Sequence, residues 1–190
     1  MKGKIEKVID ELIANRIISI EMREQYIYSM EFMIERIISI SSMVIISIVL
    51  KKMIFGGVLI LSSMSLKRYT GGYHTNSFKT CYPATMILYI IVLQLGQQLN
   101  GYESIISILL LISALMIALL GTVNHPDMNY TDEEYKESKN AARYILILEL
   151  IIIFSFKQLS IFSNYSTYMS LGIIVCALGI VAAKITKQEV

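Results

Sequence analysis

Long uncharged runs of apolar residues constrain what this chain can fold into more than any other feature of its sequence. The clearest run covers residues 105–123, which are 19 uncharged residues in succession. A helix needs about 20 mostly apolar residues to cross the hydrocarbon core of a bilayer. Only 17% of the 190 residues are charged, whereas soluble domains usually carry about a quarter. We therefore predict an all-α integral membrane protein.

Five further apolar segments bring the predicted number of membrane-embedded helices to about six. They cover residues 37–50, 53–66, 82–99, 144–156 and 165–183. The first two have only 14 residues each, so the first must borrow from the stretch before it and the second must be tilted or partly inserted. Pro83 suits the first turn of its helix, because the N–H that proline lacks has no intrahelical partner there. We expect a single domain over residues 1–190.

The N-terminal region, residues 1–36, has the pattern of amphipathic helices. Residues 3–20 repeat apolar side chains at helical spacing and place charged ones mostly on the other faces. A second stripe runs from Met22 to Ile37. Two interpretations stay open: helices that pack on the bundle or lie in the membrane interface, or a docking surface for a peptide partner. Charge interrupts residues 1–20 throughout, so no cleaved signal peptide is expected.

The distribution of lysine and arginine predicts which loops face the cytoplasm, because positive residues are retained on that side. With six crossings and a cytoplasmic N-terminus, 14 of the 17 lysine and arginine residues lie on the cytoplasmic side, and only Lys51, Lys52 and Lys157 lie on the outer side. The loop at residues 67–83 and the polar insert at residues 124–143 are then cytoplasmic. A net charge of +2 without a basic cluster gives no support for nucleic-acid binding.

The polar insert should contain a short helix that continues into the apolar segment at residues 144–156. Thr131 followed by Glu134 has the pattern of a capping box, in which each side chain accepts a hydrogen bond from the other residue's backbone N–H. Asp132 and Lys136 are spaced for an i,i+4 pair that would support the helix.

The loop at residues 67–83, KRYTGGYHTNSFKTCYP, concentrates the residue types that carry chemistry. It holds His74 and Cys81, one of two histidines and one of two cysteines in the chain. A cysteine attacks as its thiolate, which a neighbouring histidine stabilises. Seven residues of straight helix would separate these side chains by roughly 10 Å, so contact requires a bend, which Gly71 and Gly72 permit by tolerating positive φ. In the first turn of the following helix, Cys81 would also have its thiolate stabilised by the positive helix end.

Spacing alone leaves other interpretations open. A solvated imidazole and an inert thiol have the same spacing, and the glycine pair also fits an ordinary turn. His125 fits a turn residue or a lining residue of the same cytosolic cavity, and Cys176 fits a small buried hydrophobe. Glu149 is a functional-site candidate because ionisable groups are costly in a membrane, but it follows Arg143 by six residues, so a side chain that reaches the interface is preferred. Neither a P-loop nor a zinc motif is present, and no metal is expected.

The order of residues in this loop resembles the accessory gene regulator B (AgrB) family. RYTGGYH, residues 68–74, is followed after six residues by Cys81, and GTVNHP, residues 121–126, with EEYK, residues 133–136, is similar to the family's second polar segment. Length, apolar segments and the amphipathic N-terminal region also match, so the resemblance covers nearly the whole chain. It implies a membrane peptidase that processes the AgrD precursor of a quorum-sensing peptide.

The resemblance also implies roles for individual residues. Cys81 would be the nucleophile and His74 its general base. Arg68 would hold a carboxylate of the substrate, and the amides of Gly71 and Gly72 would help to stabilise the oxyanion. The resemblance identifies no residue that orients His74, and a dyad is also open. By residue type, the candidates for that orienting group are Asn76, Ser77 and Asp127.

In the implied reaction, Cys81 cleaves the precursor, releases its charged C-terminal tail and keeps the rest as a thioester. A cysteine of the peptide then closes a thiolactone, or a serine closes a lactone. The amphipathic leader of the precursor would lie in the inner membrane interface, and its tail would meet Lys136, Lys139 and Arg143. A homodimer without a cofactor is expected. Two rivals stay open: a small peptide transporter, with Glu149 and the polar insert lining its path, and a noncatalytic membrane scaffold.

Overall fold

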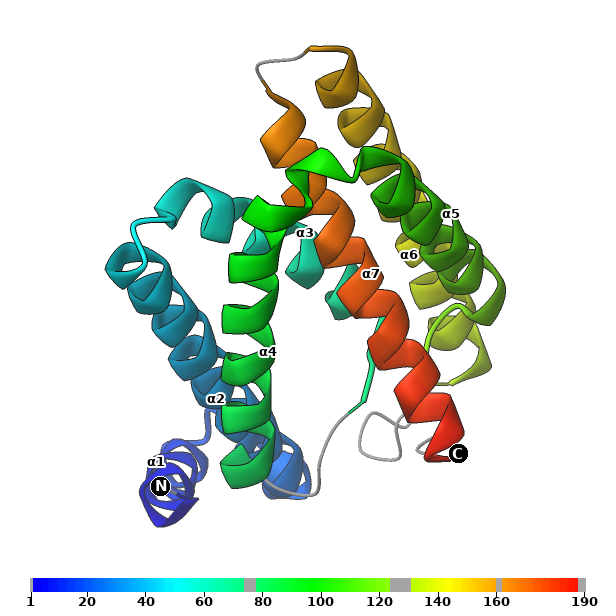
Figure 1. Cartoon of the computed structure of the whole chain (residues 1–190). Coiled ribbons are helices and arrows are strands. Elements are labelled where there is room, and N and C mark those ends of the chain that lie inside the picture. The colour runs from blue at the N-terminus through cyan, green and yellow to red at the C-terminus, as the bar shows by residue number, and fades with distance from the viewer. Residues whose placement is uncertain (1, 74–77, 124–130, 160–161, 188–190) are drawn as a thin grey trace. The chain divides into compact units, whose positions relative to one another are not determined.

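The chain is built from helices in the residues that its computed structural model describes, which are 2–73, 78–123, 131–159 and 162–187 (Figure 1). No strand occurs among these residues, so the predicted all-α class is confirmed. Two compact units, Met1–Ser42 and Met43–Val190, divide the chain within α2, and the expectation of a single domain stays a prediction. The elements are α1 (Lys2–Ala14), η1 (Ile20–Met22), α2 (Arg23–Val49), α3 (Met53–Thr70), α4 (Phe78–Gln98), η2 (Leu99–Gly101), α5 (Glu103–Leu120), α6 (Asp132–Gln158) and α7 (Ser163–Ile185).

The first unit is a helical hairpin with a small core of its own. Ile5 and Ile9 of α1 pack with Ile27 of α2, and each is at most 4% exposed. The predicted apolar stripe is therefore the packed face of the hairpin. Arg16 turns the chain with a positive φ of 59°, so the helix predicted over residues 3–20 is wrong at its C-terminal end. Docking of a peptide on this unit stays a prediction.

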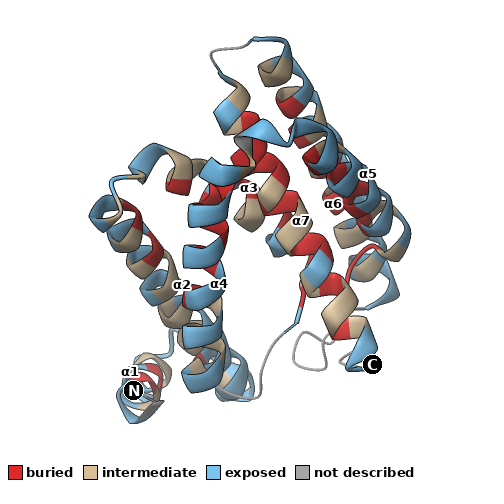
Figure 2. Cartoon of the chain, viewed as in Figure 1, coloured by how far each residue is buried: buried red, intermediate tan, exposed pale blue. Residues whose placement is uncertain are grey.

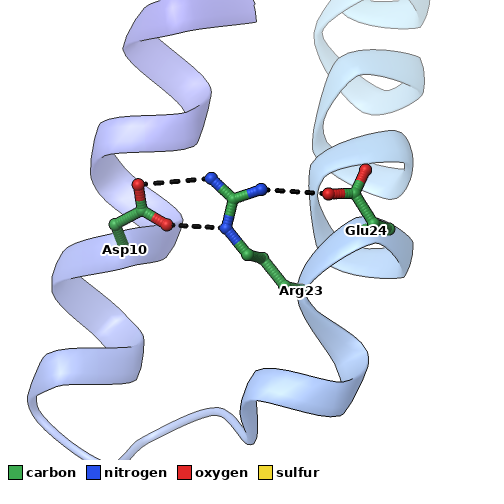
Figure 3. Close-up of polar contacts among 3 residues, drawn as sticks. All are labelled: Asp10, Arg23 and Glu24. Carbon is green, nitrogen blue, oxygen red and sulfur yellow. Dashed lines mark hydrogen bonds and ion pairs between the residues drawn. The ribbon is translucent and has the colours of Figure 1, made fainter.

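An arginine connects the two helices of this hairpin (Figure 3). The Arg23 guanidinium donates from Nε to Asp10 Oδ1 at 2.8 Å and from Nη1 to Glu24 Oε1 at 3.0 Å. Its hydrogen bond to Asp10 holds the pKa of that carboxyl below its usual range. Solvent screens exposed ion pairs, which contribute little to stability. The hairpin is therefore held mainly by its buried isoleucines.

Four of the described helical segments are long and apolar enough to cross a membrane, judged by length and composition. They are Ile20–Val49, Phe78–Gln98, Glu103–Leu120 and Ser163–Ile185. Because α2 is continuous, the first apolar run does borrow from the stretch before it, as predicted. The last turn of α3 contains two basic residues, and the apolar part of α6 is interrupted by Arg143, Glu149 and Lys157. Neither helix is therefore apolar enough over a sufficient length to count as a candidate membrane span. The membrane class is supported, whereas the predicted count of six spans is not confirmed.

The central helix of the second unit is α7. Within its most apolar stretch 56% of the residues are buried, against at most 28% in the other candidate spans, and Figure 2 shows buried residues along its length. One apolar cluster joins α3 and α7 to α5 and α6. A second cluster joins α3 and α7 to α4 and to the end of α2. The helix that leads into the loop at residues 67–83 is thus packed on both sides.

A glycine allows α7 to approach α3 closely. A Cβ on Gly172 would lie 2.8 Å from Ser62 Oγ and 3.1 Å from the backbone nitrogen of Ser63. Small residues at such contacts are typical of helices that pack within membranes. The approach places the Ser62 hydroxyl 3.0 Å from the carbonyl oxygen of Met169, which makes this contact polar as well as close.

The start of α4 differs from the prediction. The helix begins at Phe78, one turn earlier than expected, so Pro83 lies in its second turn instead of its first. Proline has no N–H to donate to the carbonyl of Lys79, four residues earlier. The rings of Phe78 and Tyr82 pack with their centroids 5.4 Å apart, and this contact supports the additional turn.

The capping box predicted at the start of α6 is confirmed. The backbone N–H of Thr131 donates to Glu134 Oε2 at 2.9 Å, and the backbone N–H of Glu134 donates to Thr131 Oγ1 at 3.3 Å. Two N–H groups that the helix leaves unpaired are thereby satisfied. Asp132 and Lys136 lie one turn apart on the same helix, but no ion pair forms between them among the described contacts.

Acidification should loosen this end of α6. The backbone N–H of Thr131, followed by its hydroxyl, holds the pKa of Glu134 below its ordinary value of 4.5. The cap therefore stabilises α6 above that value and is lost as the pH falls through the lower, folded-state pKa. Hydrogen exchange at the Tyr135 amide, which donates to the Thr131 carbonyl at 2.9 Å, should accelerate in acid relative to mid-helix amides. Thr131→Ala should show fast exchange already at neutral pH, and equal exchange in both proteins would contradict a role for the cap.

Candidate functional site

The candidate site begins where α3 ends, at the predicted glycine turn. The N–H of Gly71 donates to the Lys67 carbonyl at 3.1 Å and ends the helix. Gly71 and Gly72 have φ values of 67° and 146°, so the positive φ predicted for the pair is found. A Cβ on Gly71 would lie 3.2 Å from the carbonyl oxygen of Val123. Both conformation and space therefore favour glycine at this turn.

Two backbone hydrogen bonds hold the chain on either side of this glycine pair. The N–H of Val123 donates to the Thr70 carbonyl at 2.9 Å, and the N–H of Tyr73 donates to the Gly179 carbonyl at 3.0 Å. The first bond comes from the segment after α5 and the second goes to α7. The entry to the candidate loop is thus fastened to two other parts of the second unit.

Cys81 lies in the first turn of α4. Its side chain is half-buried, and its Sγ lies 4.0 Å from Thr85 Oγ1, one turn further along. The partial positive charge of a helix is concentrated in this turn. His74, Asn76 and Ser77 lie outside the described residues, as do His125 and Asp127, so the pairing of His74 with Cys81 stays a prediction.

Arg68 is an exposed basic residue in the last turn of α3, just before the glycine pair in the sequence. Its guanidinium carbon lies 5.6 Å from the centre of the Tyr69 ring, a cation–π arrangement. Among the described residues, no acidic side chain forms an ion pair with it. Within the described part of the chain, no carboxylate therefore pairs with the charge of Arg68.

The three basic residues predicted to contact a substrate tail have different environments on α6. Arg143 donates from Nη2 to the Ala118 carbonyl at 2.9 Å and satisfies the C-terminal end of α5. The aliphatic part of Lys139 packs over Gly121, where a Cβ would lie 2.7 Å from Lys139 Cε. Lys136 is exposed. Of the three, Lys136 is the one without such a packing role among the described contacts.

Two cavities lie toward opposite ends of α3. One, of about 280 Å³, is lined by Tyr69, Glu134, Glu137, Ser138 and Ala141. The cavity is therefore formed by the last turn of α3 and the polar start of α6. The other, of about 270 Å³, is lined by Leu50, Lys51, Lys52, Phe55, Gln97, Asn164 and Tyr168.

Glu149 is buried between helices instead of reaching the protein surface, so the preferred prediction for it is wrong. Its side chain is only 5% exposed, and its two carboxyl oxygens lie within hydrogen-bond distance of the Ser62 and Ser65 hydroxyls of α3. These serines were not predicted as partners, although three serines within an apolar run are a signal that could have suggested it. Cys176 is buried as predicted, and its thiol donates to the Ser63 carbonyl at 3.1 Å.

Comparison with known proteins agrees with the resemblance seen in the loop. A model of the family described as AgrB, accessory gene regulator B, matches residues 5–181. This range includes every candidate site residue and both polar segments. No curated protein and no solved structure matches the chain.

Proposed function

Because the chain belongs to the accessory gene regulator B family, we propose that it is a membrane cysteine endopeptidase that also cyclises its product. Membership of the family places the chain in autoinducer-peptide processing, with an AgrD-like precursor as its partner. The proposed substrate is the C-terminal tail junction of that precursor. The observation that carries this proposal is the position of Cys81 in the first turn of α4, in the segment that follows the positive-φ pair Gly71 and Gly72.

The proposed reaction has two acyl transfers. His74 accepts the proton of the Cys81 thiol, and the thiolate attacks the carbonyl carbon of the scissile peptide bond. The tail leaves as an amine, which takes the proton from His74, and the remaining peptide stays bound as a thioester. A thiol of that peptide then attacks the thioester carbonyl and displaces Cys81, which closes a thiolactone. This exchange of one thioester for another is nearly balanced in energy, so it needs no ATP if water is excluded.

The hydrogen bonds at the glycine turn distinguish the proposed roles of its two amides. The Gly71 N–H already donates to the Lys67 carbonyl, so we assign the oxyanion contact to the Gly72 N–H alone. Such a donor acts on the charge that develops on the carbonyl oxygen in the transition state. We propose that Arg68 holds a carboxylate of the substrate, because no acidic side chain in the described region forms an ion pair with it.

The membrane side and the oligomeric state are also part of the proposal. The basic residues at the end of α3 and at the start of α6 support a cytoplasmic location for both polar segments. Thiols stay reduced in that compartment, which a nucleophilic cysteine requires. We further propose a homodimer and a precursor leader that lies in the adjacent membrane interface.

Lys136→Glu should weaken capture of the precursor tail. An exposed ion pair is worth up to about 1 kcal/mol, so the Michaelis constant for tail release should rise by about fivefold with little change in turnover. The effect should shrink at high salt, which screens exposed charges. A precursor in which the charges of the tail are reversed should restore the activity of Lys136→Glu. Unchanged processing by this variant at low salt would remove the proposed contact.

A single experiment tests the proposed reaction. The full chain is expressed in membranes with its precursor, and mass spectrometry follows the released tail, the cyclic product and the mass of the chain itself. We expect tail release together with a transient increase in chain mass that equals the peptide without its tail. Hydroxylamine, which cleaves thioesters, should remove the added mass. Tail release without any acylated chain under trapping conditions would exclude the thioester step.

A peptide transporter is the alternative from another class, and it makes a different prediction. A transporter should retain function in a Cys81→Ser variant, whereas the proposed peptidase should not. Glu149, the residue expected to line a transport path, lines neither of the two cavities described above. The buried position of Glu149 therefore gives the transporter less support than the arrangement around Cys81 gives the peptidase.

A further inference from the structure

The carboxyl group of Glu149 lies within a hydrogen-bonded cluster that joins three helices. Ser62 Oγ lies 2.9 Å from Glu149 Oε2 and 3.0 Å from the carbonyl oxygen of Met169 on α7. Ser65 Oγ contacts Glu149 Oε1 and lies 2.9 Å from the Ser62 carbonyl oxygen. The cluster thus links α6 to α3 and α3 to α7.

The number of protons decides how these contacts can be made. Each serine hydroxyl has one proton, yet each faces two acceptors, a backbone carbonyl and a carboxyl oxygen. When Glu149 is ionised, only the two serine hydroxyl protons are present for four acceptors, which are two carboxyl oxygens and two backbone carbonyls. With a protonated Glu149, Oε2 donates to Ser62 Oγ, which donates to the Met169 carbonyl, while Ser65 donates to Oε1. The third proton therefore completes a continuous chain of hydrogen bonds across the three helices.

No cation in the described part of the chain neutralises an ionised Glu149. The two basic residues that flank it on α6 bind elsewhere: Arg143 donates to Ala118 and Lys157 donates to Ser107, both on α5. On α3 and α7, Lys67 and Glu149 both act electrostatically on the Cys176 thiol, and among the described contacts no ion pair joins Glu149 to Lys67 or to any other basic residue of these helices.

The remaining neighbour of α6, helix α5, has no ionisable residue after Glu103 at its start. Within the described helices packed around it, Glu149 therefore has no counterion. An unpaired carboxylate in such apolar surroundings is far less stable than the neutral acid.

We propose that Glu149 is a proton-binding site, and that its proton fixes α3 against α6 and α7. The C-terminal end of α3 carries Arg68 and the glycine turn, so Glu149 acts as a positioning residue for the candidate loop. The positioning part rests on the proposed function, whereas proton binding does not. The substitution Glu149→Gln would reproduce the protonated acid, because an amide is neutral, donates from one end and accepts at the other.

Infrared difference spectroscopy of the full chain in lipid tests proton binding directly. Wild-type protein at neutral pH should show the carbonyl absorption of a protonated carboxylic acid, and Glu149→Gln should lack it. Glu134→Gln is the matched control, because it removes an exposed carboxyl in the capping box and should leave that absorption intact. Absence of the band from wild-type protein would overturn the proposal. A carboxylate band that requires sodium would overturn it as well, since the site would then bind a metal ion.

Tail release tests the positioning role. Glu149→Gln should process the precursor within about twofold of wild type. Glu149→Ala leaves the two buried serine hydroxyls without their carboxyl partner. The rate of tail release should therefore fall about tenfold, which is the effect expected from the loss of one buried hydrogen bond. If Glu149→Ala does not accumulate, Ser65→Ala removes a single hydroxyl from the same chain and should lower tail release in the same direction.

The outcomes separate the two parts of the proposal. Loss of processing in Glu149→Gln, or full processing in Glu149→Ala, would overturn the positioning role. A wild-type chain that releases no tail would count against the proposed function, while the infrared result would still decide proton binding.

Discussion

Cys81→Ala should abolish release of the precursor tail, whereas Cys176→Ser should leave it near the wild-type rate. The two cysteines differ in their surroundings. Cys81 is half-buried in the first turn of α4, while Cys176 is 4% exposed within α7 and donates to the Ser63 carbonyl. Removing a catalytic nucleophile typically costs a factor of about 10⁴ or more in turnover. A serine at position 176 keeps a hydrogen-bond donor, so this control preserves the packing contact.

Mass spectrometry of the tail fragment provides the measurement, with equal amounts of each variant in the membrane. Cys81→Ser should also be inactive, because a serine hydroxyl is a far weaker nucleophile than a thiolate without dedicated activation. Iodoacetamide should label Cys81 and spare Cys176 in the folded chain. Substantial tail release by Cys81→Ala, or loss of release in Cys176→Ser alone, would place the chemistry elsewhere.

His74 can be tested in the same preparations through the reactivity of Cys81. His74→Ala should slow both tail release and alkylation of Cys81, because the thiol loses its general base. His125→Ala serves as the comparison, since it removes the other histidine of the chain. Equal alkylation rates in wild type and His74→Ala would show that His74 does not activate the thiol.

Features that depend on neighbouring residues could be predicted from the sequence. The capping box needs only Thr131 and Glu134, three residues apart, and the structure contains both of its hydrogen bonds. The glycine turn depends on the freedom of glycine to adopt positive φ, and both glycines do so. Helical class and membrane character follow from uncharged apolar runs. In each case the physical cause lies within a short stretch of chain.

Features that depend on distant residues were missed. The partners of Glu149 are two serines that precede it by 87 and 84 positions, so no local pattern indicates them. Proximity to Arg143 suggested an interfacial side chain, but Arg143 donates to Ala118 of α5 instead. The start of α4 was misplaced because Pro83 was assigned to a first turn, whereas the helix tolerates it in the second.

Gly71→Ala should lower tail release by about tenfold or more, while Gly57→Ala should have little effect. Gly71 has φ 67° and ψ −139°, a region that only glycine occupies readily, and forcing another residue into it costs about 1–3 kcal/mol. The added Cβ would also press on the Val123 carbonyl at 3.2 Å. The turn should therefore change shape and shift the Gly72 N–H away from the oxyanion position that we propose for it.

The control and a third variant separate strain at this turn from a general effect of losing a glycine. Gly57 lies in α3 with nothing within 4 Å of its Cβ position, and alanine is the better helix former by about 1 kcal/mol. Gly71→Asn discriminates further, because asparagine tolerates positive φ only together with positive ψ. We therefore expect Gly71→Asn to be as defective as Gly71→Ala in the mass-spectrometric assay of tail release. Normal processing by both Gly71 variants would mean that the turn does not position the reacting groups.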